Sequence, residues 1–179
     1  MKKTSGFTTF SSHERGFTLI ELLVVVTIIA TLAVAVFVAL NPAKRLVDAK
    51  DARRTSDVDT ILTAIHAAIV DNKGSVPTNL PLAGQERQLG TGDATVATGC
   101  GTALTLNGCN TPALTACANL LTDLNVDLIP YLKSMPIDPS GGPTYTSVKT
   151  GYSVAYDANG IVTIRACGTE GTTPIFSSR

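Results

Sequence analysis

Residues 17–40, FTLIELLVVVTIIATLAVAVFVAL, form an unbroken apolar run in which Glu21 is the only charged side chain. A helix over this run is about 36 Å long at a rise of about 1.5 Å per residue. That length spans the hydrocarbon core of a bilayer, which is about 30 Å thick. The run is therefore predicted to be a membrane-spanning helix, and it fixes the first element of the fold.

A cleavable secretory signal is the simplest alternative for an apolar run near the N-terminus. The apolar part of such a signal covers about 7–15 residues and ends at an Ala-x-Ala-like site. The present run is longer, and residues 39–42, ALNP, lead into a charged stretch without such a site. An uncleaved signal anchor stays open as another interpretation.

Basic side chains ahead of the run favour a cytoplasmic start. Lys2, Lys3 and Arg15 precede it, and basic residues beside a span favour the cytoplasmic side. The basic residues within 44–54 argue for the opposite orientation, although aspartates are interspersed with them. Removal of residues 1–16 would change the formal net charge from zero to −2. We therefore expect no general or specific nucleic-acid binding.

Glu21 is the residue in the run that requires an explanation. A charged side chain near the centre of a bilayer costs about 2.5–3.5 kcal/mol and usually has a partner. Near the end of a helix, the same side chain can instead extend to the interface. Its position alone leaves both interpretations open.

Residues 16–21, GFTLIE, join a basic leader to the apolar run. This arrangement resembles the processing site of type IV prepilins and type II secretion pseudopilins. The resemblance implies that a membrane-embedded prepilin peptidase cuts between Gly16 and Phe17 and methylates the new amine of Phe17. It also implies that Glu21 pairs with the N-terminal amine of a neighbouring subunit, which offsets the desolvation of both charges. Many family members carry a proline inside the run, whereas here Pro42 follows only at its end.

Residues 43–72 contain neither Gly nor Pro and repeat apolar side chains at helical spacing. We expect an amphipathic helix that continues the span, packs its stripe under a globular head and turns its charged face towards neighbouring subunits. Lipid headgroups or DNA are alternative partners for its basic residues. Residues 72–74, NKG, are predicted to end the helix. The stripe consists of Val47, Arg54, Val58, Ile61, Leu62, Ile65 and Ile69.

The C-terminal part changes to the two-residue period of strands. Residues 152–156 and 161–166 flank Asn159-Gly160, which is a strong hairpin signal between two such runs. The other predictions for the head are a third strand at 144–148, loops with one short strand at 74–112, a small helix at 113–124 and a turn at 127–132.

Residues 131–139, YLKSMPIDP, are similar to the Pro-x-Asp-Pro turn before the final sheet of major pseudopilins and related short pilins. Some major pseudopilins bind calcium in this part of the head, so aspartates here are candidate oxygen ligands. Their alternative role is the formation of turns and caps. We expect no other cofactor. The calcium candidates are Asp123, Asp127, Asp138 and Asp157.

The cysteines lie beyond the apolar run, in a part of the chain that we expect to be exported. Disulfides are predicted there, with three pairings open, and free thiols are the alternative. The spacing of the cysteines fits no zinc site. The candidates are Cys100, Cys109, Cys117 and Cys167.

No enzyme is expected, because the sequence has no nucleophile elbow, phosphate loop, zinc-protease motif or dinucleotide fingerprint. The resemblance implies a homo-oligomer in a helical filament, with prepilin peptidase and a membrane assembly platform of a pilus or secretion system as partners. It also implies a single-pass membrane protein that later enters an extracellular pilus or a periplasmic filament. A structural pilin for adhesion, motility or DNA uptake is the favoured function. The alternatives are a type II secretion pseudopilin that supports protein export and an anchored binding module that does not polymerise.

The predicted organisation has four parts, and the predicted fold class is α+β and pilin-like. A long N-terminal helix, made of the membrane span and the amphipathic half, packs against a small C-terminal antiparallel sheet. The parts are a cytoplasmic leader at 1–16, the span and filament-core helix at 17–40, the amphipathic helix at 41–72 and the head at 73–179.

Overall fold

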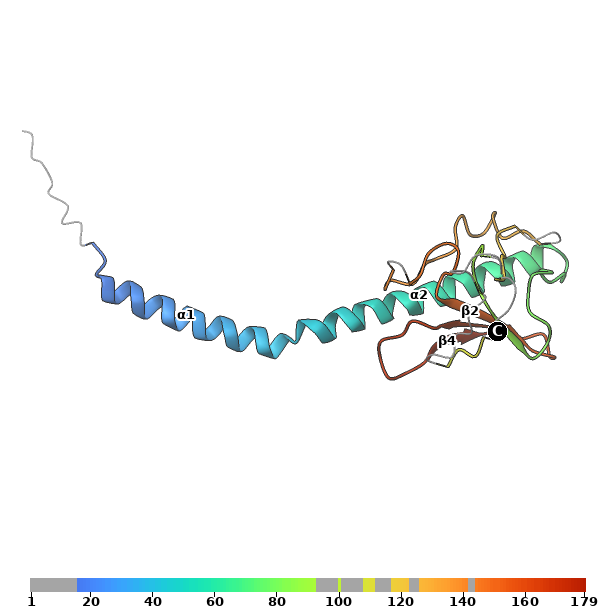
Figure 1. The fold of residues 1–179 in the computed structure, drawn as a ribbon. Coiled ribbons are helices and arrows are strands. Elements are labelled where there is room, and N and C mark those ends of the chain that lie inside the picture. The colour runs from blue at the N-terminus through green and yellow to red at the C-terminus, as the bar shows by residue number, and fades with distance from the viewer. Residues whose placement is uncertain (1–15, 93–99, 101–107, 112–116, 123–125, 142–143) are drawn as a thin grey trace, which may run out of the picture. The chain divides into compact units, whose positions relative to one another are not determined.

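The computed structural model describes residues 16–92, 100, 108–111, 117–122, 126–141 and 144–179 (Figure 1). The chain forms two compact units, Met1–Pro42 and Ala43–Arg179. The predicted α+β class, with apolar N-terminal helix and small C-terminal antiparallel sheet, is confirmed. The elements are α1 (Leu19–Leu40), α2 (Pro42–Asp71), β1 (Gln85–Gln88), β2 (Tyr152–Tyr156), β3 (Val162–Ala166) and β4 (Ile175–Ser178).

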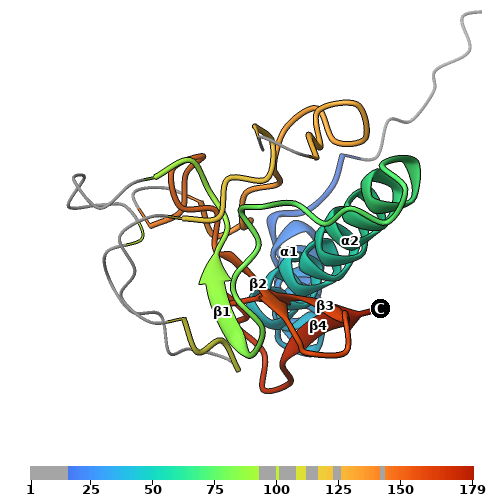
Figure 2. The same cartoon turned by 90° about the vertical axis from the view of Figure 1, so that its right-hand side faces the viewer.

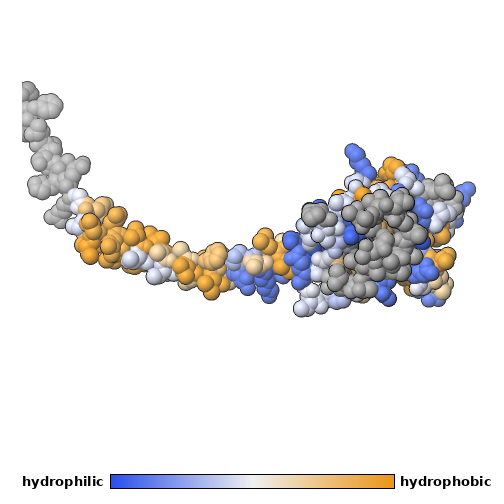
Figure 3. Space-filling view, viewed as in Figure 1, coloured by the Kyte–Doolittle hydropathy of each residue, from blue (hydrophilic) through white to orange (hydrophobic). Residues whose placement is uncertain are grey.

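Helix α1 is apolar on all sides, and none of its residues is buried. Figure 3 shows this apolar surface in orange. The helix ends where Asn41 adopts the left-handed conformation, with φ 40°, which Asn tolerates better than most residues. Pro42 is the first residue of α2, a position where its missing N–H removes no helical hydrogen bond. The helix that was expected to continue from the span is therefore interrupted at Asn41, between α1 and α2.

Helix α2 ends in a Schellman-type cap. The amide of Gly74 donates to the carbonyl of Ile69 at 2.8 Å, and the amide of Lys73 donates to Val70 at 3.2 Å. The first left-handed residue after the helix is Lys73, with φ 57°, and Gly74 follows with φ 86°. The predicted end at residues 72–74 is correct, but the glycine stands one position beyond the first left-handed residue.

The four strands form one antiparallel sheet in the order β1-β2-β3-β4. Strands β2 and β3 are the predicted hairpin, and Val154 lies opposite Ile164. The third strand predicted at 144–148 is wrong, because described residues 144–148 form a turn and bends. Thr146 pairs its amide with the carbonyl of Lys149, which closes a local turn. The outer strands are β1, which is the short strand expected within residues 74–112, and β4 near the C-terminus, which was not predicted.

The core of the second unit lies between α2 and the sheet. Figure 2 shows the strands as a layer beside α2. Each buried aliphatic side chain stabilises this contact by about 1.5–3 kcal/mol relative to an exposed one. The helix contributes Val58, Ile61, Leu62 and Ile65, and the two central strands contribute Tyr152, Val154, Val162 and Ile164.

The small helix predicted at 113–124 is wrong for residues 117–122, and its remaining residues lie outside those described. Ala118 instead forms an isolated parallel bridge with Leu89. Its amide donates to the carbonyl of Gln88 at 2.7 Å, so the backbone bonds that a helix would use are made to the end of β1. The predicted turn at 127–132 is present, because Leu132 donates to the carbonyl of Leu128 at 2.8 Å.

Two disulfides connect segments of the head that are distant in sequence. Cys100 pairs with Cys117, and Cys109 pairs with Cys167. No free cysteine remains, since all four are paired. The structure therefore selects one of the three pairings that the sequence left open.

Candidate processing and assembly site

Residues 16–18 precede α1 and lie outside helices and strands. No atom lies within 4 Å of the position that a Cβ would occupy on Gly16. The side chain of Phe17 is 91% exposed. The peptide bond between these residues is thus on open backbone, which is the kind of segment that peptidases cut.

Thr18 and Glu21 form a capping box at the start of α1. The amide of Glu21 donates to Thr18 Oγ1 at 3.3 Å. The amide of Thr18 donates to Glu21 Oε2 at 2.8 Å, and its hydroxyl donates to the same oxygen at 2.8 Å. The box satisfies amides that the first turn of a helix leaves without partners. It therefore turns the Glu21 carboxylate back towards the residues before the helix.

The predicted cut would place a new ammonium group on Phe17, one residue before this cap. Glu21 Oε2 already accepts from the amide of the next residue, Thr18. The positive end of the helix dipole also favours a carboxylate in the first turn. The arrangement suits a carboxylate that binds an N-terminal amine, while the cut itself and the amine partner of Glu21 stay predictions.

The described part of the chain contains one helix that is long and apolar enough to cross a membrane. Its apolar window lies in α1, where Phe37 is 67% exposed and Val38 is 72% exposed. Exposed apolar surface of this extent is stable only against lipid or against other apolar helices. The surface of α1 is therefore suited first to a bilayer and then to the interior of an assembly.

A second polar site lies in the other unit and is centred on Arg54, whose side chain is fully buried. Its Nε donates to Asp138 Oδ2 at 2.7 Å, and its Nη2 donates to Asp138 Oδ1 at 2.8 Å. Its Nη1 donates to Asp51 Oδ1 at 2.6 Å. Burial opposes the charged form of Arg54, but the hydrogen bonds to Asp138 and Asp51 outweigh it and raise the pKa of the guanidinium above its ordinary value.

The rim of this ionic cluster connects α2 to the loop between β3 and β4. Lys50 Nζ lies 2.7 Å from Glu170 Oε1, and the amide of Gly171 donates to Asp51 Oδ2 at 3.0 Å. Ser140 Oγ donates to Glu170 Oε1 at 3.0 Å. Lys50 and then Ser140 lower the pKa of Glu170 by hydrogen bonding to its carboxylate. The cluster thus fastens two loops to one turn of α2.

Sequence reasoning placed Arg54 in the apolar stripe of the helix and did not assign it a partner. The stripe is correct, because Arg54 does face the core with Val58 and Ile61. A cation within a stripe that packs under a head requires a buried carboxylate. The sequence therefore did contain a signal that Arg54 needs an acidic partner. Asp138 in the Pro-Ile-Asp-Pro segment is that partner.

The calcium candidates among the described residues each bind a different group of the protein. Asp127 accepts from the amide of Ile129 at 2.9 Å, and Asp138 binds Arg54. Asp157 organises the β2–β3 turn by accepting from the amides of Asn159 and Ile161, each at 2.8 Å. Asp123 lies outside the described residues. Among those described, no three His, Cys, Asp or Glu side chains are grouped to hold a metal ion.

The methylation motif is also found by comparison with known protein families. A family model described as the prokaryotic N-terminal methylation motif matches residues 11–37. No curated protein and no solved structure matches the chain. The motif implies processing by a prepilin peptidase and assembly into pilus-like filaments. Residues 11–37 therefore carry the N-terminal methylation motif that is the signature of type IV pilins and pseudopilins.

Proposed function

We propose that this chain is a structural subunit of a type IV pilus-like filament, cut after Gly16 and polymerised through its N-terminal helix. The observation that carries the proposal is the first turn of α1. There, the only carboxylate of the apolar run is directed back towards Phe17 by the Thr18–Glu21 capping box. The rest of α1 has no buried residues, so its apolar side chains are open to contact with other copies.

The filament accounts for both features of this helix. Other copies of α1 would cover its apolar side chains, which gain about 25 cal/mol for each Å² removed from water. Glu21 would bind the Phe17 ammonium of a neighbouring copy within that apolar interior. An unpaired charge there would cost several kcal/mol, so the pair favours addition of subunits in one register.

The same helix would anchor the precursor before assembly. We propose that α1 holds the precursor in the membrane and that residues 43–179 lie on the exported side. The two disulfides support export, because such bonds persist in oxidising compartments. The role is structural rather than catalytic, since filament formation requires no reaction by this chain after processing.

A type II secretion pseudopilin is the second candidate. The segment Pro136-Ile137-Asp138-Pro139 favours it, because a similar turn precedes the final sheet of major pseudopilins. A short periplasmic filament would then support the export of other proteins. Filament length and location separate the two functions: long surface filaments indicate a pilus, and protein export that depends on the chain indicates a pseudopilus.

Replacement of Glu21 tests polymerisation directly. The full chain would be expressed with a prepilin peptidase and a pilus assembly platform, and sheared filaments would be quantified. Glu21→Ala is expected to be processed and membrane-bound but to yield no filaments. The matched control is Thr27→Ala, which removes a hydroxyl that donates only within the same helix, to the carbonyl of Val24. Normal filaments from Glu21→Ala would instead support a membrane-anchored module that does not polymerise through this contact.

A further inference from the structure

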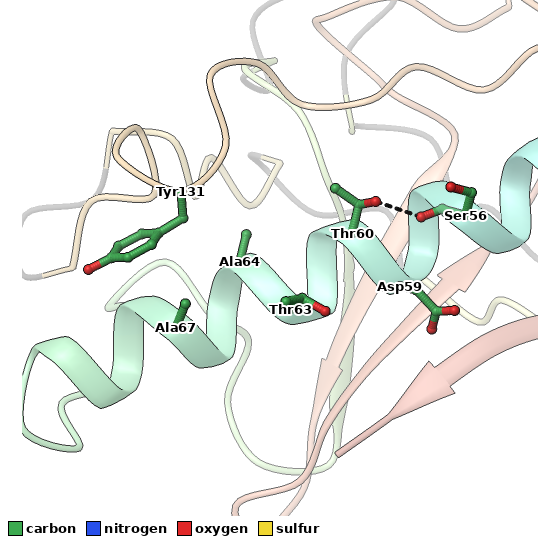
Figure 4. Close-up of a pocket in the computed structure, with 7 residues that line it drawn as sticks. All are labelled: Ser56, Asp59, Thr60, Thr63, Ala64, Ala67 and Tyr131. Atoms are coloured by element: carbon green, nitrogen blue, oxygen red, sulfur yellow. Dashed lines mark hydrogen bonds between the residues drawn. The ribbon is translucent and has the colours of Figure 1, made fainter.

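An open groove runs along the face of α2 that is turned away from the core (Figure 4). Its volume is about 490 Å³. The floor consists of short side chains, including Ser56, Thr60, Thr63 and Ala67, and Tyr131 forms a wall. Among the described residues that line it, Asp59 is the only charged one. The groove is thus a recess of largely small side chains with one carboxylate beside it.

The groove is held in shape by contacts within the same unit. The hydroxyl of Tyr131 donates to Asp71 Oδ2 at 2.5 Å, which fixes the wall to the end of α2. The hydroxyl of Thr60 donates to the carbonyl of Ser56 at 2.7 Å, which fixes the rotamer of this side chain. A partner would therefore meet a preformed surface of small side chains and would not need to order it.

The charges of α2 are unevenly distributed along its length. Residues 43–54 contain five basic and two acidic side chains, whereas residues 55–71 contain three acidic side chains and neither Lys nor Arg. Arg54 and Lys50 are used in the ionic cluster, and the formal charge of the first segment is positive. One end of α2 is thus complementary in charge to the groove at the other end.

An exposed apolar side chain accompanies the basic end. Leu46 is 66% exposed and directly follows Lys44 and Arg45. A leucine beside cations matches a recess of small side chains beside a carboxylate. The complementary features are separated by the same interval, because Arg45 precedes Asp59 by 14 positions and Leu46 precedes Thr60 by 14 positions.

We propose that this groove receives the basic end of α2 from a second copy of this chain. Leu46 of that copy would fill the recess beside Thr60, and Arg45 would lie against Asp59. Two parallel helices shifted by 14 residues, or about 21 Å, bring these pairs to the same height. Because 14 residues return to nearly the same helix face, the second copy must also be rotated about its axis so that its basic end faces the groove. The inference rests on the proposed function, because it names a subunit contact within the filament.

The contact joins different surfaces on the two copies, so it is heterologous. Each copy that offers its basic end keeps its own groove open for the next copy. A heterologous contact that does not close into a ring continues as a helical filament. The geometry of α2 therefore supports polymerisation independently of the charge pair in α1.

Filling the groove tests this contact in the full chain, in cells with a prepilin peptidase and an assembly platform. Thr60→Trp is expected to lower the yield of sheared filaments about tenfold or more, since each tenfold corresponds to about 1.4 kcal/mol per subunit contact. Thr55→Trp is the matched control: Thr55 is also exposed on α2 and also donates to a carbonyl four residues earlier, but it does not line the groove. Its yield is expected to stay near that of the unsubstituted chain.

Charge reversal identifies the occupant. Asp59→Arg is expected to reduce filaments, and the double variant Arg45→Asp/Asp59→Arg is expected to restore them. Normal filaments from both Thr60→Trp and Asp59→Arg would overturn the proposal. Loss without restoration in the double variant would overturn the choice of the basic end as occupant. Membrane-bound, disulfide-bonded precursor at normal level is required of every variant, so that misfolding is not counted as failed assembly.

The Glu21→Ala variant separates this inference from the proposed function. If Glu21→Ala abolishes filaments while the groove variants assemble normally, the chain polymerises but not through the groove. If the unsubstituted chain forms no filaments under conditions in which it is processed, the proposed function itself fails.

Discussion

The guanidinium of Arg54 and the carboxylate of Asp138 form a two-point ion pair, although the residues are 84 positions apart and both side chains are fully excluded from solvent. The pair joins the fourth turn of α2 to the Pro-Ile-Asp-Pro segment. Paired charges at this depth compensate each other's desolvation, whereas one alone would not be compensated. The attachment of the head loops to the helix should therefore depend on both partners together.

Breaking this pair should destabilise the second unit strongly. Arg54→Met is expected to cost about 3–5 kcal/mol, because it leaves the buried carboxylate of Asp138 without its cation. Asp138→Leu should cost less, because Arg54 keeps its ion pair with Asp51. The double variant should cost less than the sum of the two, since it removes both charges. Chemical unfolding of the mature chain in detergent, followed by the signal of the head, gives these values. A strictly additive double variant would contradict the coupling.

Gly168 is expected to be required because of its distance from Asp138. A Cβ on Gly168 would lie 2.5 Å from Asp138 Oδ2, closer than any normal contact. Gly168→Ala should therefore cost about 1–3 kcal/mol through displacement of the buried carboxylate. The same substitution should cost much less in an Asp138→Ala background, where the obstructing atoms are absent. Equal costs in the two backgrounds would locate the strain elsewhere.

Glu170 should make the head less stable in acid. Its pKa is lowered in the folded chain, first by the hydrogen bond from Lys50 and then by Ser140. A carboxylate with a lowered pKa contributes stability above its unfolded pKa, near 4.3, and loses that contribution as the pH falls through the lower folded value. Glu170→Gln should thus unfold at a lower temperature than the unsubstituted chain at pH 7. In acid, the two chains should unfold at similar temperatures. In a Lys50→Met background, the difference at pH 7 should shrink, and an unchanged difference would exclude Lys50 as its main cause.

The cysteine pairing can be read by peptide mapping without reduction. The expected linked peptides contain Cys100 with Cys117 and Cys109 with Cys167. The second bond closes the longer loop, with a sequence separation of 58, and its removal by Cys109→Ser/Cys167→Ser should cost about 2–5 kcal/mol. Removal of Cys100 and Cys117 as a matched pair should cost less, because their separation is 17. A Cys109–Cys117 peptide would contradict this arrangement.

The elements set by local pattern were predictable from the sequence, and those set by distant contacts were not. The apolar run, the end of α2 at residues 72–74 and the hairpin at Asn159-Gly160 all follow from spacing and turn chemistry within a short window. A short strand was expected within residues 74–112, but its position was not, because β1, QERQ, has no apolar alternation and is placed by its pairing with β2. The helix expected at 113–124 had apolar spacing, but at Ala118 tertiary hydrogen bonds to β1 replace helical ones.

The candidate sites divide in the same way. Gly16, Phe17 and Glu21 belong to one short motif, so sequence reasoning could place them together. The ionic cluster combines Arg54 with residues 138 and 170, and no local pattern relates positions so far apart. The resemblance to major pseudopilins made Asp138 a calcium candidate, whereas its buried carboxylate binds the guanidinium of Arg54.

The most direct test of the central claim is the intact mass of the mature protein from its native membrane or surface fraction, with fragmentation of its N-terminus. The account predicts a chain that begins at Phe17 and carries a methyl group on the α-amine. A chain that still begins at Met1, or one that is cut beyond Leu40, would contradict pilin-type processing and with it the filament function proposed for α1.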